Sequence, residues 1–403
     1  MKTRKLLVIG TFAVILALVF ASCGGDNGGV IPAHTPGLLF TLIDNDTAYS
    51  VSRGTATAAE VIIPAVYNGL PVTEIGNSGF ETYTAMTSVF IPDSVTSIGA
   101  RAFAECFSLT SITIPDSVTS IGGSAFSSCV GLESITVNSG NTVYRSEGNC
   151  LIEISSNTLI RGCKNSVMPS SVTSIGEYAF SRITGLTSII IPDSVTSIGW
   201  GAFSGCTGLT SITISNSVTN IGGAAFYGCT GLTSITIPDS VTSIEQMAFN
   251  NCTGLTNISI PDSVTWIGPS AFCADFESIT VDSGNTVYRS EGNCIIQISN
   301  NALIHGCKNS IIPDSVTSIG FAAFINCTGL TSIIIPDSVT NIGSNAFNGC
   351  WRLTSVTLGT ITEADFHTNT FPGNLRDVYF ADGGGAGTYT TTNPGNSATW
   401  TKQ

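Results

Sequence analysis

Residues 114–136 read IPDSVTSIGGSAFSSCVGLESIT, and this stretch decides the fold because it recurs along most of the chain. The phrase IPDSVTSIG occurs without change at residues 91–99, 114–122, 191–199 and 312–320. The period is about 23 residues, and recurrence at such a period indicates a stacked repeat. Copies begin at Ile63, Ile91, Ile114, Met168, Ile191, Ile214, Ile237, Ile260, Ile312 and Ile335.

Each copy contains two stretches in which apolar and hydroxyl-bearing residues alternate, LTSITI and SVTSI. Alternation with a period of two predicts strands that are buried on one face. Pro115 is expected to end the first strand, because proline has no N–H for a ladder, and Asp116 to follow in a turn. The AFxxC segment is expected to be irregular or 3₁₀-like, with Phe126 as a buried wedge. One copy cannot bury its own apolar face, so the copies must stack at a strand spacing of about 4.8 Å.

The pattern LxxIxIPxxVxxIGxxAFxxC resembles the BspA-like, treponemal-type leucine-rich repeat over roughly residues 37–360. The resemblance implies a β-rich, curved, right-handed solenoid on a bacterial surface or secreted protein, and members of this family are often adhesins. The chain departs from the pattern in a short copy at 260–280 and in two insertions at about 137–166 and 281–311. The pattern is clearest at Leu109, Ile112, Ile114, Val118, Ile121, Ala125, Phe126 and Cys129.

The ends of the chain differ from the repeat. Residues 1–22 carry a positive start, an apolar run and small residues before Cys23, which predicts a lipoprotein signal peptide and lipidation of Cys23. An ordinary cleaved signal or a short membrane anchor is the alternative. Residues 23–36 are expected to be a flexible tether. The rest of the chain is predicted to form an N-terminal capping unit with a first degenerate repeat at 37–90, the solenoid at 91–358 and a C-terminal cap at 359–403. Within this cap, VYF at 378–380 is expected to be a strand and Trp400 to be a packing residue.

The charge balance excludes one class of partner. Removing residues 1–22 takes three of the 14 Lys and Arg, so 11 cationic side chains remain against 27 Asp and Glu, and the formal charge becomes −16. Nucleic acid favours basic proteins, so it is not an expected partner. The acidic balance suits an exported surface protein, although solubility alone also explains it.

The cysteines fall into two groups. Cys106, Cys129, Cys206, Cys229, Cys252, Cys327 and Cys350 share one repeat position, and a ladder of buried thiols is favoured there over bridges, because parallel side chains fit disulfide geometry poorly. The two insertions repeat GNTVYRSEGNC at 140–150 and 284–294, and each continues into a predicted hairpin. Such hairpins would place Cys150 opposite Cys163 and Cys294 opposite Cys307, so cross-strand disulfides are a hypothesis, with apolar filling as the alternative.

Catalytic signatures are missing from the sequence. It has three histidines, no CxxC pair and none of the common catalytic motifs, so we predict no enzyme, no cofactor and no metal site. The repeated aspartates are expected in turns, with calcium bridging as the alternative. The outward Ser and Thr columns fit strand propensity and solubility, with binding to glycans or ice as alternatives.

A partner is expected to bind where the repeat varies. The most varied positions lie between IG and C, and exposed aromatic residues there are favoured interface anchors. Basic insertions on an acidic scaffold are the second candidate. The sequence thus predicts a lipid-anchored protein of the outer membrane or cell surface that adheres to proteins or glycans of host matrix or other cells, with a structural envelope component or a glycan-binding solenoid as alternatives. The candidate binding residues are Tyr178, Trp200, Tyr227, Phe321, Arg145, Arg161, Lys164, Arg289 and Lys308.

Overall fold

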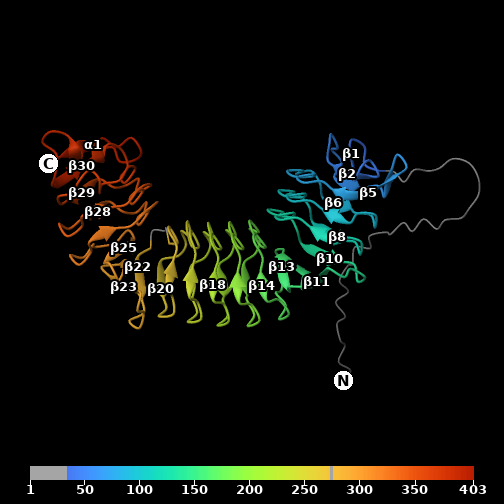
Figure 1. Ribbon diagram of the computed structural model, residues 1–403, viewed down its shortest axis with the longest axis horizontal. Helices are drawn as coiled ribbons and strands as arrows, with labels where there is room; N and C mark the ends of the chain where they lie inside the picture. The colour runs from blue at the N-terminus through green and yellow to red at the C-terminus, as the bar shows by residue number, and fades with distance from the viewer. Residues whose placement is uncertain (1–33, 273–275) are drawn as a thin grey trace, which may run out of the picture. The chain divides into compact units, whose positions relative to one another are not determined.

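The computed structural model describes residues 34–272 and 276–403. From His34 onward the chain belongs to one unit, a β-solenoid built from coils of roughly 23 residues (Figure 1). The solenoid expected from the repeat is therefore confirmed. The predicted signal peptide, Cys23 and residues 24–33 of the predicted tether lie outside the described residues, and these remain predictions.

Most coils contribute two short strands that run parallel to those of their neighbours. Ser197 of one coil pairs with Asn220 of the next, and Asn220 pairs with Ser243, so the register follows the repeat. The first strand of a coil ends before the proline, as at Ile114, because proline cannot continue the ladder. Both expected strands are present in most coils, although residues 232–237 form none, and the AFxxC segment that follows the second strand consists largely of turns.

The strands at the first position are β3 (Glu60–Ile62), β6 (Ser88–Phe90), β8 (Ser111–Ile114), β10 (Ser134–Val137), β15 (Ser188–Ile190), β17 (Ser211–Thr213), β20 (Asn257–Ile260), β22 (Ser278–Val281), β27 (Ser332–Ile334) and β29 (Ser355–Leu358). The strands at the second position are β5 (Leu70–Ile75), β7 (Ser97–Ile98), β9 (Ser120–Ile121), β14 (Ser174–Ile175), β16 (Ser197–Ile198), β18 (Asn220–Ile221), β19 (Ser243–Ile244), β21 (Trp266–Ile267), β26 (Ser318–Ile319) and β28 (Asn341–Ile342).

The phenylalanine of each AF pair forms a stacked column inside the solenoid. Phe126 is 2% exposed, which confirms it as a buried wedge. The ring of Phe226 lies 5.4 Å from that of Phe203 and 5.3 Å from that of Phe249, with planes within 7° of parallel. Offset parallel rings at this spacing are attractive as well as apolar. Within each run of coils between the insertions, the column therefore joins successive coils into one core cluster.

Two residues in most coils adopt left-handed backbone, four positions apart. The first is the second residue after IG, as at Ser124 (φ 58°) and Ala224 (φ 52°), and the other is the second residue after AF, as at Ser128 (φ 60°) and Gly228 (φ 68°). A side chain in this conformation costs roughly 1–2 kcal/mol unless the residue is glycine. The turns that bring each phenylalanine inward are thus held by packing between coils.

The Gly228→Ala variant isolates the conformational cost of the left-handed residues. A Cβ atom on Gly228 would meet no atom closer than 4.0 Å, so sterics within the fold add nothing. We expect the free energy of unfolding to fall by about 1 kcal/mol. Ala224→Gly in the same coil is expected to raise it by a few tenths of a kcal/mol, since glycine also costs more chain entropy. Urea denaturation of both variants checks this, and equal effects of one sign would contradict it.

Each insertion forms a three-stranded antiparallel meander rather than a projecting loop. The strands are β11 (Tyr144–Glu147), β12 (Cys150–Glu153) and β13 (Thr158–Arg161) in the first insertion, and β23 (Tyr288–Glu291), β24 (Cys294–Gln297) and β25 (Ala302–His305) in the second. The third strand pairs in parallel with the next coil, β13 with β14 and β25 with β26. Each insertion therefore starts a new run of parallel strands.

The sequence that the two insertions share connects this new run of parallel strands to the preceding run through hydrogen bonds. The hydroxyl of Tyr144 accepts a hydrogen bond from the N–H of Ile121 at 2.9 Å. Ile121 lies in β9, the last strand of the preceding ladder. Buried Asn141 donates to the carbonyl oxygens of Pro115 and Val118 and accepts from the backbone of its own turn. Tyr288 and Asn285 make the corresponding bonds in the second insertion. The identical residues thus satisfy backbone groups that would otherwise be buried without partners.

The hairpins are present, but the expected disulfides are not. In the first hairpin Leu151 pairs with Arg161, which leaves Cys163 beside Asn149 rather than opposite Cys150. Cys150, Cys163, Cys294 and Cys307 are buried thiols. The predicted cross-strand pairing assumed the wrong register: it requires Ile152 opposite Arg161, whereas Ile152 pairs with Leu159, and a β-bulge between Leu151 and Ile152 then places Leu151 opposite Arg161.

The cysteines that share one repeat position form a buried ladder, as expected. The thiol of Cys129 donates to the carbonyl oxygen of Phe103 in the preceding coil, with a sulfur–oxygen distance of 3.0 Å. Cys206 and Cys229 donate in the same way to Phe180 and Phe203. The thiol is therefore both a small apolar filler and a donor that satisfies a turn carbonyl.

These thiols predict a loss of stability at alkaline pH. Burial raises the pKa of Cys129 to about 11 and that of Cys206 to about 12. The unfolded chain loses its thiol protons near pH 8.5 while the folded chain keeps them, so their stabilisation is complete below about pH 8.5 and is lost as pH rises toward 11–12. We expect the Tm to fall across this window. Burial also raises the pKa of Tyr144, so a Cys206→Ala variant, with a weaker alkaline fall, identifies the thiol contribution. An unchanged slope would contradict it.

The two ends of the solenoid carry elements outside the repeat. Strand β1 (Leu39–Ile43) pairs antiparallel with β2 (Ala48–Ser52), and β4 (Val66–Tyr67) pairs with β5. Strand β30 (Gly387–Thr390) pairs antiparallel with β29, and β31 (Thr401–Lys402) follows it. Buried Trp400 donates its indole N–H to the carbonyl oxygen of Pro372, which confirms it as a packing residue.

The strand predicted at residues 378–380 is wrong. These residues end helix α1 (Leu375–Phe380), the one helix among residues 34–272 and 276–403. Leu375 and Tyr379 are buried, and the Tyr379 hydroxyl donates to the carbonyl oxygen of Gly359. The spacing of four between these two residues suits one helix face, and a three-residue apolar run alone does not distinguish helix from strand.

Candidate functional site

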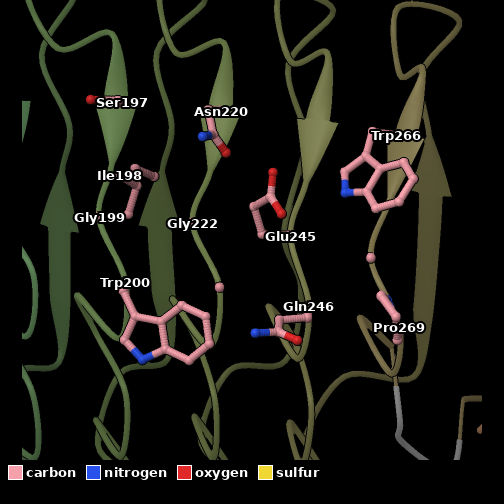
Figure 2. Close-up of a pocket in the computed structure, with 12 residues that line it drawn as sticks. Ser197, Ile198, Gly199, Trp200, Asn220, Gly222, Glu245, Gln246, Trp266 and Pro269 are labelled. Atoms are coloured by element: carbon pink, nitrogen blue, oxygen red, sulfur yellow. The ribbon is translucent and has the colours of Figure 1, made fainter.

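A groove crosses four coils on the face formed by β16, β18, β19 and β21. Its volume is about 500 Å³. Trp200 and Trp266 lie at opposite ends, and Glu245 and Gln246 lie between them (Figure 2). Glycines from several coils, such as Gly222 and Gly268, line it and leave room that side chains would otherwise fill. Aromatic residues with a few polar groups are the usual lining of a binding site.

Trp200 is placed by the glycine of the next coil. A Cβ atom built on Gly223 would lie 2.2 Å from the indole of Trp200, so the ring rests directly over this backbone. One coil earlier, Tyr178 lies over Gly201 in the same way, with a corresponding distance of 2.6 Å. The positions of both aromatic rings therefore require a glycine at the facing position in the next coil.

Trp266 and the polar residues replace the usual residues of the repeat. Trp266 occupies the outward strand position where Ser197 and Ser243 stand in other coils, and its side chain is 53% exposed. Glu245 takes the place of the glycine in IG and accepts a hydrogen bond from Ser243 at 2.6 Å. The Oδ1 atom of Asn220 is buried and has no hydrogen-bond partner in the structure. These substitutions give one face of the array a chemical character of its own.

Of the predicted aromatic anchors, only Trp200 lines the groove. Tyr227 is 40% exposed, but it follows AF rather than IG and belongs to a different part of the coil. Phe321 is 55% exposed and lies beyond the second insertion. Trp266 was missed because the search of the sequence covered the positions after IG. A tryptophan at a strand position that otherwise holds serine is the signal that would have found it.

The basic residues of the insertions do not form an open patch. Arg161 is 2% exposed, so its place among the candidate binding residues is corrected: it is a core residue. Its guanidinium donates to the carbonyl oxygen of Tyr178, and burial lowers its pKa. The position corresponds to His305 in the second insertion, which packs edge-on against Phe272 and whose pKa burial lowers to about 4. Both residues fill the gap where the insertion interrupts the phenylalanine column.

The other four basic residues are paired with acids. The shortest of these ion pairs joins Lys164 to Glu133 at 2.6 Å, and Lys308 pairs with Glu277 at the same place in the second insertion. Such partly exposed pairs contribute little to stability, but they neutralise the charge offered to a partner. The remaining pairs are Arg145 with Glu147 and Arg289 with Glu291.

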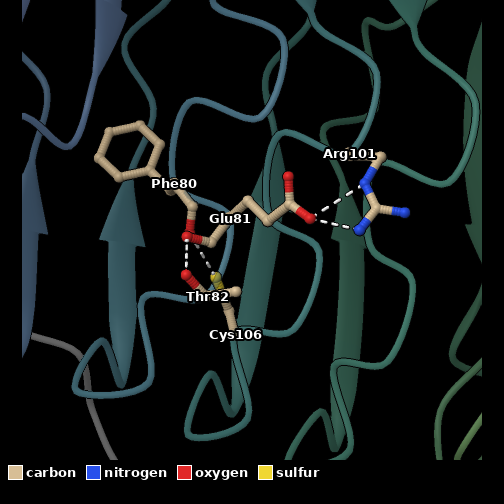
Figure 3. Close-up of polar contacts among 5 residues, drawn as sticks. All are labelled: Phe80, Glu81, Thr82, Arg101 and Cys106. Atoms are coloured by element: carbon tan, nitrogen blue, oxygen red, sulfur yellow. Dashed lines mark hydrogen bonds and ion pairs between the residues drawn. The ribbon is translucent and has the colours of Figure 1, made fainter.

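A further ion pair links two of the first coils. Arg101 reaches back to Glu81 of the preceding coil, beside the contact between the Cys106 thiol and the Phe80 carbonyl oxygen (Figure 3). The guanidinium of Arg101 lowers the pKa of the Glu81 carboxyl. The pair neutralises Arg101, which stands one residue after the position of Trp200. By contrast, none of the ion pairs among the described residues involves Glu245, so the groove keeps one unpaired carboxylate.

The described residues contain neither a cluster of metal-binding side chains nor a membrane-spanning helix. No three His, Cys, Asp or Glu side chains gather into a group that would hold a metal ion in residues 34–272 and 276–403. None of the helices in the same residues is long and apolar enough to cross a membrane.

A β-solenoid of short parallel strands and irregular turns, repeated at this period, is a leucine-rich repeat protein. The chain belongs to the family described as the BspA type leucine-rich repeat region (6 copies), whose model matches residues 73–161, 152–280 and 296–383. The expected family is therefore confirmed over more than half of the chain. No curated protein matches the chain.

Several solved structures are similar to it. A leucine-rich cell surface protein from Faecalibacterium prausnitzii is 31% identical over 81% of this chain and 76% of that chain, with a TM-score of 0.47. A leucine-rich repeat protein from Bacteroides ovatus is 28% identical over 83% and 85%, with a TM-score of 0.48. One from Eubacterium ventriosum is 22% identical over 83% and 97%, with a TM-score of 0.45.

Proposed function

We propose that this protein is a cell-surface adhesin, held to the membrane by a lipid on Cys23, that binds macromolecules of host or neighbouring cells. The observation that carries the proposal is the groove between Trp200 and Trp266, a concave face with the exposed indole of Trp266, the half-buried indole of Trp200 and an unpaired carboxylate. Membership of the BspA-type family and the cell-surface description of one relative support the location.

The arrangement suits binding rather than catalysis. The nucleophiles in the described chain that catalysis would favour, its cysteines, are buried, and burial raises the pKa of most of them. The groove itself is wide and open across four coils, which suits a long ligand. Many copies on one cell would convert modest affinity per groove into firm attachment.

Binding of the chain from residue 24 onward to matrix proteins and to whole cells tests the adhesin proposal. We expect saturable binding that falls tenfold or more in a Trp200→Ala, Trp266→Ser double variant. Trp351→Ala is the matched control, because its indole is exposed outside the groove, and it should bind as the parent does. Absence of binding to every surface would overturn the proposal, as would equal binding by the double variant.

Lipid anchoring has a separate test. In the producing bacterium, Cys23→Ala should move the full-length protein from the membrane fraction to the soluble fraction, since one thiol is the attachment point for the lipid. Unchanged membrane association of this variant would count against a lipid anchor.

A further inference from the structure

We infer that the groove between Trp200 and Trp266 binds an uncharged oligosaccharide chain. Its sugar rings lie on the two indoles, and its hydroxyl groups meet the polar residues between them. This inference rests on the proposed binding function and names the chemistry of the ligand.

The two indoles supply the stacking surfaces. The face of an indole is electron-rich, and the C–H groups on one side of a pyranose ring carry partial positive charge, so the two attract each other. Trp266 exposes 53% of its surface. Trp200 lies flat against Gly223, which fixes its ring without blocking the groove. A rigid aromatic residue loses little conformational entropy when a ligand binds.

The spacing of the coils suits an extended chain. Ser197, Asn220, Ser243 and Trp266 are successive register partners on β16, β18, β19 and β21. Three steps at strand spacing place Trp266 roughly 14 Å along the stack from β16, where Trp200 follows. A single small molecule would reach one indole. A chain of several sugar units would reach both and would run along the groove.

The polar groups between the indoles match hydroxyls. Asn220 lines the groove, and its side-chain amide N–H groups can donate to a hydroxyl oxygen. Glu245 accepts one bond from Ser243 at Oε1, which leaves acceptor sites on its carboxylate. The side-chain amide of Gln246 both donates and accepts. A hydroxyl also does both, so a sugar chain can satisfy all three groups.

Charge and backbone pairing argue against two other ligands. The unpaired carboxylate of Glu245 repels sulfated or uronic-acid chains, and the acidic protein adds to this repulsion. An extended peptide would be expected to add to a sheet edge. Strands β18 and β19 are already paired on both sides within an eight-stranded sheet, so the floor of the groove offers no such edge.

Titration of the chain from residue 24 onward with neutral hexaoses tests the inference. The probes are cello-, laminari-, manno- and chitohexaose, with tryptophan fluorescence and calorimetry as readouts. We expect at least one probe to bind saturably. Trp266→Ser and Trp200→Ala should each weaken that binding tenfold or more, Glu245→Gln severalfold, and Trp351→Ala not at all. Serine and alanine are the repeat's own residues at these positions, as in Ser243 and Ala100, so both variants should keep the parent's Tm.

The outcomes separate this inference from the proposed function. If the parent adheres to cells or matrix proteins but binds none of the hexaoses, the sugar inference is overturned and the adhesin proposal stands. If Trp351→Ala weakens hexaose binding as much as Trp266→Ser, the groove is not the site and the inference is again overturned. If the parent binds neither sugars nor any surface, both fail. Binding of a sulfated chain in preference to its neutral counterpart would overturn the choice of an uncharged ligand.

Discussion

The Phe226→Ala variant is expected to lose about 3–5 kcal/mol of the free energy of unfolding. Phe226 is fully buried, and its ring lies between those of Phe203 and Phe249 at 5.4 and 5.3 Å. Alanine removes the apolar surface, both ring contacts and the volume that the ring fills. The neighbouring rings belong to coils fixed by strand pairing, so they cannot move together to close the cavity.

The loss should be concentrated in the middle of the array. The buried apolar residues fall into three clusters that change over near the two insertions, and Phe226 lies in the cluster that spans Cys150 to Cys307. In a repeat protein each coil depends on its neighbours, so hydrogen exchange should rise first in the coils next to Phe226. Urea denaturation measures the total effect. Tyr227→Ala, 40% exposed and adjacent in sequence, should change stability by no more than about 0.5 kcal/mol.

Equal losses in the free energy of unfolding for Phe226→Ala and Tyr227→Ala would contradict this account. It would mean that the phenylalanine column contributes no more than an exposed side chain, and that strand pairing alone holds the coils in register. The Phe103→Ala variant offers a repetition in the first core cluster, where the ring also stacks between two others.

The burial of the repeated positions could be predicted from the sequence, because in a stacked array a residue at the same repeat position has the same surroundings in each coil. Ile114, Phe126 and Cys129 were placed in the core from their recurrence alone, and all three are buried. Pro115 predicted the end of a strand, because proline lacks the N–H that a strand ladder needs. None of these inferences depended on knowing which coil lies beside which, since the register of a repeat is set by its period.

Residues that interrupt the repeat could not be placed in this way. Arg161 was expected at the surface because it is charged, yet the meander turns it inward where no phenylalanine is available. The cysteines were misplaced because the sequence does not show where the hairpin turns: Ile152 pairs with Leu159 rather than with Arg161, so Cys150 and Cys163 are not opposite each other. The groove likewise needs Trp200 and Trp266 on one face, and only the register of four strands brings them together.

The Asn141→Ala variant should cost about 3–5 kcal/mol and open the chain at the first insertion. The side chain donates to the carbonyl oxygens of Pro115 and Val118 at 2.8 and 2.9 Å, and it accepts from the N–H groups of Val143 and Tyr144. Alanine leaves these four backbone groups without their partner, and each buried polar group so left costs roughly 1–3 kcal/mol, less where water can enter. Limited proteolysis should show a new cleavage site near the insertion.

The second insertion provides an internal comparison for the same argument. Asn285 makes the corresponding bonds to Pro261 and Val264, so Asn285→Ala should have a similar cost at a different place in the chain. The two variants act on separate junctions, and their effects should add in the double variant. Thr142→Ala is the matched control, because Thr142 is exposed beside Asn141. If Thr142→Ala lowers the free energy of unfolding as much as Asn141→Ala does, the hydrogen bonds of the asparagine do not stabilise the junction between the two runs of coils. The sequence that the two insertions share would then have another cause.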